Sequence, residues 1–158
     1  MKIFLIRHGQ TTGDIADLYG GTYNDHLSAK GVKQAKELIL NLKDKGIEII
    51  FSSPYNRARE TAEIIARNIA VPIEIKTDLR ERNAYGFMDG KSKQEMAEKY
   101  PEEVAKAQDY RLTVREGEEY EYFKKRILAV IMKLLRWIII LSQLSPTAVL
   151  SAVFIARS

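Results

Sequence analysis

The first half of the chain alternates short apolar runs with longer segments of helical periodicity, and this alternation constrains the fold more than any other feature. Three apolar runs are long enough for buried strands, namely Lys2–Ile6, Ile47–Phe51 and Pro72–Ile75. The segments between them carry apolar residues at helical spacing. A strand–helix–strand–helix–strand order is typical of a parallel α/β sheet.

Helix-capping residues mark where the two intervening helices begin. Ser28 is the expected N-cap of the first helix, which should end near Gly46. Ser52-Ser53-Pro54 precedes the second helix and should place Pro54 in its first turn. The expected buried face of the second helix carries Ala58, Ala62, Ile65 and Ile69.

The second half is polar at first and then becomes strongly apolar. We expect two short helices, near Lys93–Lys99 and Pro101–Asp109, and a long helix over Glu116–Arg136. Trp137–Leu141 is predicted as a fourth apolar strand. The chain of 158 residues has no repeat or linker, so we expect one α/β domain over residues 1–158, with an atypical tail at 137–158.

Composition excludes several kinds of chemistry. The chain has no cysteine, which excludes disulfides, thiolate metal sites and cysteine nucleophiles, and it has two histidines, His8 and His26. The net charge of +4 fits an ordinary solvated surface better than a nucleic-acid platform. Because Met1–Ile6 is too short for the apolar region of a signal peptide, we expect a cytoplasmic protein.

Candidate site residues follow the predicted strands directly. Arg7-His8-Gly9 comes after the first strand, and Arg57 lies at the start of the helix after the second. In open parallel sheets, ligands bind at the carboxyl ends of the strands, and arginine is well matched to phosphate oxygens. The alternative for His8 is a side chain merely packed at a strand end.

A carboxylate follows the third strand. Glu81 stands between Arg80 and Arg82. Beside a phosphate site, such a group could serve as a general acid. A surface ion pair is the competing interpretation.

Taken together, these segments resemble the histidine phosphatase superfamily, whose fold is that of phosphoglycerate mutase. The similarity runs in order through five motifs: Phe4–Thr11, Gly20–Gly31, Ser52–Ala62, Leu79–Glu81 and Gly117-Glu118. The resemblance implies a three-layer α/β/α fold with a mostly parallel sheet. It also implies that the C-terminal part of this fold is incomplete here.

The resemblance also implies a mechanism. His8 would attack phosphorus to give a phosphohistidine, and Glu81 would protonate the leaving alcohol. The residues implied to bind the substrate, a small phosphorylated metabolite, are Arg7, Gln10, Asp14, Gly21, Thr22 and Arg57. No metal or other cofactor is expected. The short segment between Glu81 and Gly117 favours a phosphatase. A phosphoglycerate-mutase-type transferase and a catalytically inactive phosphate-binding module remain alternatives.

The sequence departs from the family pattern at several positions. Asp14 stands where many members have asparagine, and its charge disfavours an anionic substrate unless it is paired. His26 stands where many have proline, so we expect a loop residue. The family's second catalytic histidine, in an apolar strand followed by Ser/Thr-His-Gly-Gly, has no counterpart after His26. Instead, Ile138–Leu141 leads to Ser142-Gln143.

The tail from Trp137 to Ala156 contains no charged residue, and three explanations are open. A membrane anchor is disfavoured by Gln143, Pro146 and the serines of the tail. Gln143 could be a genuine replacement of the histidine. The third explanation, which we favour, is a frameshift between about Leu128 and Arg136, because the codon junctions from Pro146 to Ala152 permit His-Gly-Gly-Pro-Ile-Arg in another frame. The chain as written should then be weakly active or inactive, and poorly stable. Its oligomeric state is open.

Overall fold

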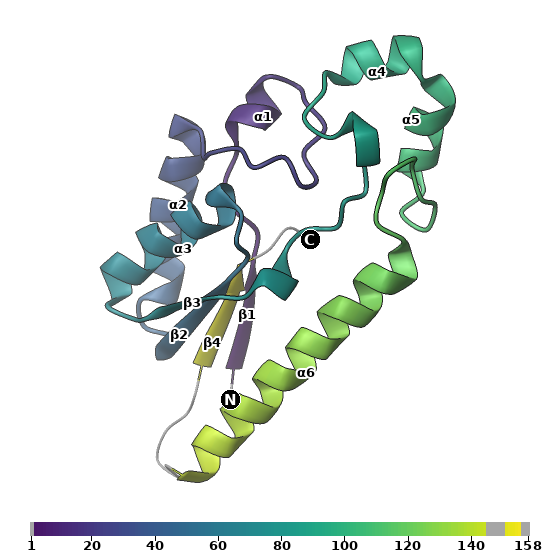
Figure 1. Cartoon of the computed structure of the whole chain (residues 1–158). Helices are drawn as coiled ribbons and strands as arrows, with labels where there is room; N and C mark the ends of the chain where they lie inside the picture. Colours follow the sequence, from purple (N-terminus) through teal and green to yellow (C-terminus); the bar gives the residue numbers. More distant parts are fainter. Residues whose placement is uncertain (1, 145–150, 156–158) are drawn as a thin grey trace.

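The structure is a computed structural model that describes residues 2–144 and 151–155. Its elements follow the α/β order expected from the sequence (Figure 1). The strands are β1 (Lys2–Ile6), β2 (Ile47–Ser52), β3 (Ile73–Ile75) and β4 (Ser151–Ile155). The α-helices are α1 (Thr12–Ile15), α2 (Ala29–Leu42), α3 (Asn56–Ile69), α4 (Lys93–Lys99), α5 (Pro101–Gln108) and α6 (Tyr120–Leu144). Two 3₁₀ turns are η1 (Thr77–Leu79) and η2 (Gly86–Met88).

The described strands form one parallel sheet in the order β1-β4-β2-β3. The last strand in the sequence therefore lies between the first and the second. β4 pairs with β1 from Lys2↔Ser151 to Ile6↔Ile155, and its other side pairs with β2. Because all strands run the same way, the segments that follow β1, β2 and β3 emerge at one edge of the sheet (Figure 1).

Helices cover both faces of the sheet, which confirms the three-layer expectation. On one face, α2 and α3 pack on β1 and β2 through a core that includes Ile6, Leu42, Ile50 and Ile65. On the other face, α6 places Val130 and Leu134 against Phe51. Val130 and Leu134 are four residues apart, so they lie on the same side of the helix.

The predicted strand at Trp137–Leu141 is wrong, because this segment belongs to α6, which continues to Leu144. An apolar run of this length is compatible with either a strand or a buried helix, so periodicity alone could not decide. The helix also begins later than expected. Glu116 has a φ of 63°, a left-handed conformation that a helix does not contain, and α6 starts at Tyr120.

The other predicted elements agree closely with the structure. β1 has the predicted bounds, and the Ser28 hydroxyl accepts a hydrogen bond from the Gly31 N–H as the N-cap of α2. The short helices α4 and α5 lie where they were expected. Pro54 is not in the first turn of α3, because the N-cap of that helix is Tyr55. Pro54 instead belongs to the loop in which the Ser53 hydroxyl accepts the Tyr55 N–H.

A small second cluster stands beyond the carboxyl edge of the sheet. Tyr19, Met88, Met96 and Val114 pack together there and join the α1 loop to the segment between β3 and α6. Figure 1 shows α1, α4 and α5 at this end of the molecule. These elements lie beyond the edge of the sheet at which the candidate site residues emerge.

No helix in the described parts of the chain is both long and apolar enough to cross a membrane. The alternative reading frame concerns Pro146–Ala152, most of which lies outside the described residues. The frameshift therefore stays a prediction.

Candidate active site

The candidate site lies at the carboxyl edge of the sheet, where three loops meet. His8 follows β1, Arg57 is the second residue of α3 after β2, and Glu81 follows η1 after β3. The α2 helix closes one side, and its fit is tight because a Cβ built on Gly31 would stand 2.0 Å from the Gln10 carbonyl oxygen. Glycine at that position lets α2 approach the loop that carries His8.

His8 is buried, with 7% of its surface exposed, and its ring has a defined orientation. Nδ1 lies 2.8 Å from the Gly9 carbonyl oxygen, and Nε2 lies 3.2 Å from Nε of Arg57. A carbonyl oxygen only accepts and a guanidinium only donates. Nδ1 therefore carries the proton, and Nε2 presents its lone pair toward Arg57.

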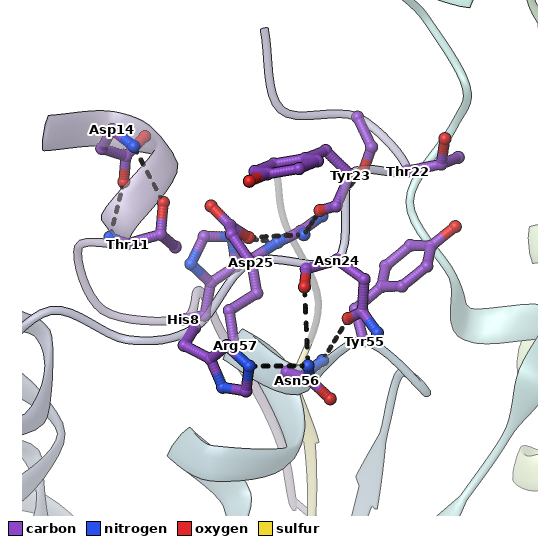
Figure 2. A network of polar contacts seen from close by, with 12 residues as sticks. His8, Thr11, Asp14, Thr22, Tyr23, Asn24, Asp25, Tyr55, Asn56 and Arg57 are labelled. Atoms are coloured by element: carbon purple, nitrogen blue, oxygen red, sulfur yellow. Dashed lines mark hydrogen bonds and ion pairs between the residues drawn. The ribbon is translucent and has the colours of Figure 1, made fainter. Parts of the chain in front are cut away.

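Arg57 is almost completely buried, and its guanidinium is held from several sides (Figure 2). Nη1 donates to the Tyr23 carbonyl at 2.6 Å and to Oδ1 of Asp25 at 3.0 Å. Nη2 donates to the Gly21 carbonyl at 2.7 Å. These contacts fix the plane of the guanidinium beside the His8 ring.

Asp25 compensates the charge of Arg57, and the sequence analysis did not single it out. Both side chains of this ion pair are 3% exposed. Asp25 lies inside the Gly20–Gly31 motif, but its partner is 32 residues away. A single sequence carries no signal that joins two positions so far apart, so only the folded chain reveals the pair.

Tyr55 adds an aromatic face to Arg57. The guanidinium carbon lies 4.9 Å from the centroid of the Tyr55 ring. Burial raises the pKa of Tyr55 above its ordinary value of 10.0, although the nearby charge of Arg57 opposes this shift. The phenol therefore stays protonated at neutral pH and can donate a hydrogen bond.

A cavity of about 490 Å³ opens beside His8, and Arg7, Gln10 and Asp14 line it. Arg7 is exposed there, whereas Gln10 is tied down, because its Oε1 accepts from the Ser28 hydroxyl at 2.9 Å. The Asp14 carboxylate accepts the Thr11 N–H at 2.9 Å as part of a capping box at α1. A backbone donor thus offsets part of the negative charge that the sequence analysis identified as unfavourable.

Gly21, Thr22 and Glu81 form a second group of the predicted site residues. The Asp89 carboxylate accepts the Gly21 N–H at 2.6 Å and the Thr22 hydroxyl. Glu81 lines a second cavity of about 490 Å³ together with Gly21. Arg7, His8, Gln10 and Asp14 thus line the first cavity, and Gly21 and Glu81 line the second, while the Gly21 carbonyl contacts Arg57.

An arginine of α6 holds the loop that carries Glu81. Arg126 contacts the Glu118 carboxylate through Nε at 3.0 Å and Nη2 at 2.8 Å. Its Nη1 donates to the carbonyls of Asp78 and Arg80, which come just before Glu81 in the chain. The sequence analysis quoted Glu118 only as part of a motif and did not identify Arg126.

His26 lies apart from these contacts, in the loop before α2. It is exposed, its Nδ1 contacts Glu60, and its Nε2 lies 3.2 Å from Nδ2 of Asn56. Within residues 2–144 and 151–155, no group of three or more histidine, aspartate or glutamate side chains could hold a metal ion.

The chain is similar to proteins of one known family. The sequence profile of a family described as the histidine phosphatase superfamily (branch 1) matches residues 3–137. The chain is 35% identical to the phosphatase PhoE of Bacillus subtilis over 102 residues, which are 65% of this chain and 52% of the relative. It is 36% identical to a 2,3-bisphosphoglycerate-dependent phosphoglycerate mutase of Borreliella burgdorferi over 107 residues, which are 65% and 43% of the two chains.

Among solved structures, the α-ribazole phosphatase of Shigella flexneri superposes with a TM-score of 0.79 at 23% sequence identity. The match covers 99% of this chain and 74% of that one. This similarity concerns the fold. The chain spans about half the length of the curated relatives that it matches.

Proposed function

The chain belongs to the histidine phosphatase superfamily, and from this premise we propose that it is a phosphate-monoester hydrolase that acts through a phosphohistidine on His8. The observation that carries the proposal is the pairing of the His8 ring with Arg57. Nε2 holds a lone pair and lies 3.2 Å from a buried cation that binds phosphoryl oxygens well. A nucleophile and an anion-binding group thus lie next to each other.

In the proposed reaction, Nε2 of His8 attacks phosphorus and the bond from phosphorus to the leaving oxygen breaks. Glu81 gives its proton to the leaving alcohol. Water then attacks the phosphohistidine and gives a proton back to the Glu81 carboxylate, the N–P bond breaks, and phosphate leaves. Arg57 and the exposed Arg7 neutralise the charge on the phosphoryl oxygens during both steps.

The hydrogen bond from Nδ1 of His8 to Gly9 supports the first step. It stabilises the tautomer in which Nε2 is the nucleophile, and it stabilises the positive charge that the ring acquires when Nε2 is phosphorylated. The phosphoryl group must take over the Arg57 N–H that now faces Nε2. A guanidinium has five N–H donors, so Arg57 can bind the phosphoryl group and keep its contacts with Asp25 and the Tyr23 and Gly21 carbonyls.

We also propose that turnover by this chain is slow, because it contains no second histidine able to contact the phosphoryl group. His26 is the other histidine of the chain, and it lies outside the site. Sequencing the coding DNA downstream of the Arg126 codon separates a frameshift, which would spell His-Gly-Gly, from a genuine replacement by Gln143.

Trapping the covalent intermediate tests the proposed function. The chain is mixed with a ³²P-labelled phosphomonoester and quenched in alkali, where phosphohistidine survives. We expect label on the wild type and on His26→Gln, the matched control, but not on His8→Ala. Label that persists in His8→Ala, or its absence from the wild type, would contradict the proposal. The second outcome would instead support a phosphate-binding module without catalysis.

A mutase-type transferase is the second candidate, and the matching relative from Borreliella burgdorferi favours it. Transfer would require the phosphohistidine to pass its phosphoryl group to phosphoglycerate rather than to water. Incubation of the labelled chain with phosphoglycerate separates the two reactions, since a hydrolase releases inorganic phosphate and a mutase returns a labelled ester.

A further inference from the structure

The cavity beside Glu81 has walls unlike those of the cavity beside His8. Four aromatic side chains line it, namely Tyr85, Tyr110, Tyr120 and Phe123. They come from the segment between β3 and α6 and from the first turn of α6. This aromatic cavity, of about 490 Å³, is large enough for a small ring system.

The aromatic walls are already held in place. The rings of Tyr110 and Tyr120 meet edge to face with centroids 5.2 Å apart. Tyr85 packs on Tyr19 at 4.8 Å, and Tyr19 belongs to the small cluster beyond the sheet edge. A ligand that enters does not have to order these side chains, which lowers the entropic cost of binding.

The charges around the aromatic cavity argue against a second anionic group. Arg82 is the one basic residue among the described residues that line it, and each of its three guanidinium nitrogens already donates to a backbone carbonyl. Nε donates to the Glu118 carbonyl at 2.8 Å, Nη2 to the Leu112 carbonyl at 3.0 Å, and Nη1 to the Tyr110 carbonyl. Its guanidinium carbon also lies 5.7 Å from the centroid of the Tyr120 ring. Arg82 therefore acts as part of the wall.

The position of the aromatic cavity links it to the proposed reaction. Gly21 lines it, and the Gly21 carbonyl accepts from Nη2 of Arg57 at 2.7 Å. Glu81 also lines it, so the proposed proton donor faces the same space. A phosphoryl group held by His8 and Arg57 would have its leaving group directed toward the aromatic rings.

We propose that the aromatic cavity binds the alcohol part of the substrate, and that it selects a flat, uncharged aromatic group over a small anionic one. The preferred substrates are then aryl or heteroaromatic phosphomonoesters rather than phosphoglycerates. This inference rests on the proposed function, because the roles of His8 and Glu81 place the leaving group there. Aromatic rings bind aromatic ligands by offset or edge-to-face stacking.

A kinetic comparison tests the preference. Phe123→Ala removes one wall, and Tyr122→Ala is the matched control, because Tyr122 is the preceding residue of α6 and is 60% exposed. For 1-naphthyl phosphate, we expect Phe123→Ala to lower kcat/KM about tenfold, as the loss of one stacking partner implies. For glycerol 2-phosphate, whose leaving group has no ring to stack, Phe123→Ala should cost less than it does for 1-naphthyl phosphate, and Tyr122→Ala should match the wild type on both esters. An equal loss on the two substrates would overturn the inference.

A variant that fills the aromatic cavity, instead of removing one of its walls, provides a second test. Ala107 lines it from α5, and Ala107→Leu keeps a good helix former while occupying the space. We expect this variant to lose more activity on 1-naphthyl phosphate than on glycerol 2-phosphate, because the naphthyl group needs more of the space. Unchanged activity on both esters would show that the cavity does not receive the leaving group.

A binding measurement separates failure of this inference from failure of the proposed function. If the wild type hydrolyses neither ester, the proposed hydrolase is wrong, but calorimetry with 1-naphthylphosphonate still examines the cavity. We expect Phe123→Ala to weaken binding of this phosphonate about tenfold and Tyr122→Ala to leave it unchanged. Absence of binding to the wild type, or equal affinity in all three proteins, would refute the aromatic subsite.

Discussion

The buried ion pair between Asp25 and Arg57 leads to a quantitative prediction. Asp25→Asn removes the negative charge but keeps the shape of the side chain and one carbonyl oxygen that can accept from Nη1. The change leaves the Arg57 charge buried beside the carbonyls of Tyr23 and Gly21. The effect on stability therefore reports the charge of Asp25 rather than its volume.

The expected loss follows from the burial of the pair. Opposite charges about 4 Å apart attract by about 4 kcal/mol at an effective dielectric constant of about 20. Removal of one partner from a buried pair costs about 3–5 kcal/mol. Because Arg57 keeps its carbonyl acceptors, we expect the lower end, about 3 kcal/mol. For a chain of this size the melting temperature should fall by about 6–12 °C.

Urea unfolding of the wild type and of Asp25→Asn measures the loss directly. The matched control is Asp17→Asn, whose carboxylate pairs with Lys93 at 2.6 Å on the surface, with the two side chains 69% and 47% exposed. This control should change the free energy of unfolding by less than about 1 kcal/mol. Inorganic phosphate should stabilise Asp25→Asn more than the wild type, since an anion beside Arg57 replaces the missing charge.

The reasoning is refuted if Asp25→Asn and Asp17→Asn cost the same. That result would mean that solvent or another group compensates Arg57, so that Asp25 does not hold the guanidinium in place. A normal loss of stability with no additional effect of phosphate would be a different failure. It would keep the ion pair but reject Arg57 as an anion-binding group.

Three further predictions concern packing, capping and pH. Gly31→Ala should destabilise the fold by about 1–3 kcal/mol, because its Cβ would stand 2.0 Å from the Gln10 carbonyl oxygen; unfolding as in the wild type would contradict this. Ser28→Ala should cost about 1 kcal/mol by removing the N-cap of α2, and Ser28→Thr, measured in the same denaturation series, should recover most of that loss. The pKa of Glu103 is lowered, first by its hydrogen bond from Lys106, so carboxyl NMR should find it below 4.5. The stabilisation that this carboxylate provides is present above pH 4.5 and should be lost as the pH falls through the lowered pKa, whereas a pKa at or above 4.5 would show that the bond is not formed in solution.

Much of the fold could be predicted because local signals and the global architecture agree. The β1 run ends at Arg7 and His8, Ser28 caps α2, and both features belong to segments of a few consecutive residues. The order of strands and helices then requires a parallel sheet, which places the ends of β1 and β2 at one edge. The sequence thus predicts that His8 and Arg57 emerge close together at this edge.

The secondary structure of the apolar tail could not be predicted from its local pattern. Trp137–Leu141 fits a strand or a helix equally well by periodicity, and the structure continues α6 through it. The strand that lies between β1 and β2 is Ser151–Ile155 instead. Which apolar segment enters the sheet depends on competition between long-range pairings, and no local pattern records that competition.

The sequence by itself determined the class of fold, the edge of the sheet at which the candidate site residues emerge, and the residue types present there. These depend on periodicity, caps and motifs, all of which are local along the chain. Only the tertiary structure decided that Asp25 compensates Arg57, that Arg126 holds the Glu81 loop, and that aromatic rings line the neighbouring cavity. These contacts join residues tens of positions apart, and burial makes them strong, so their partners are set by packing rather than by any neighbouring residue.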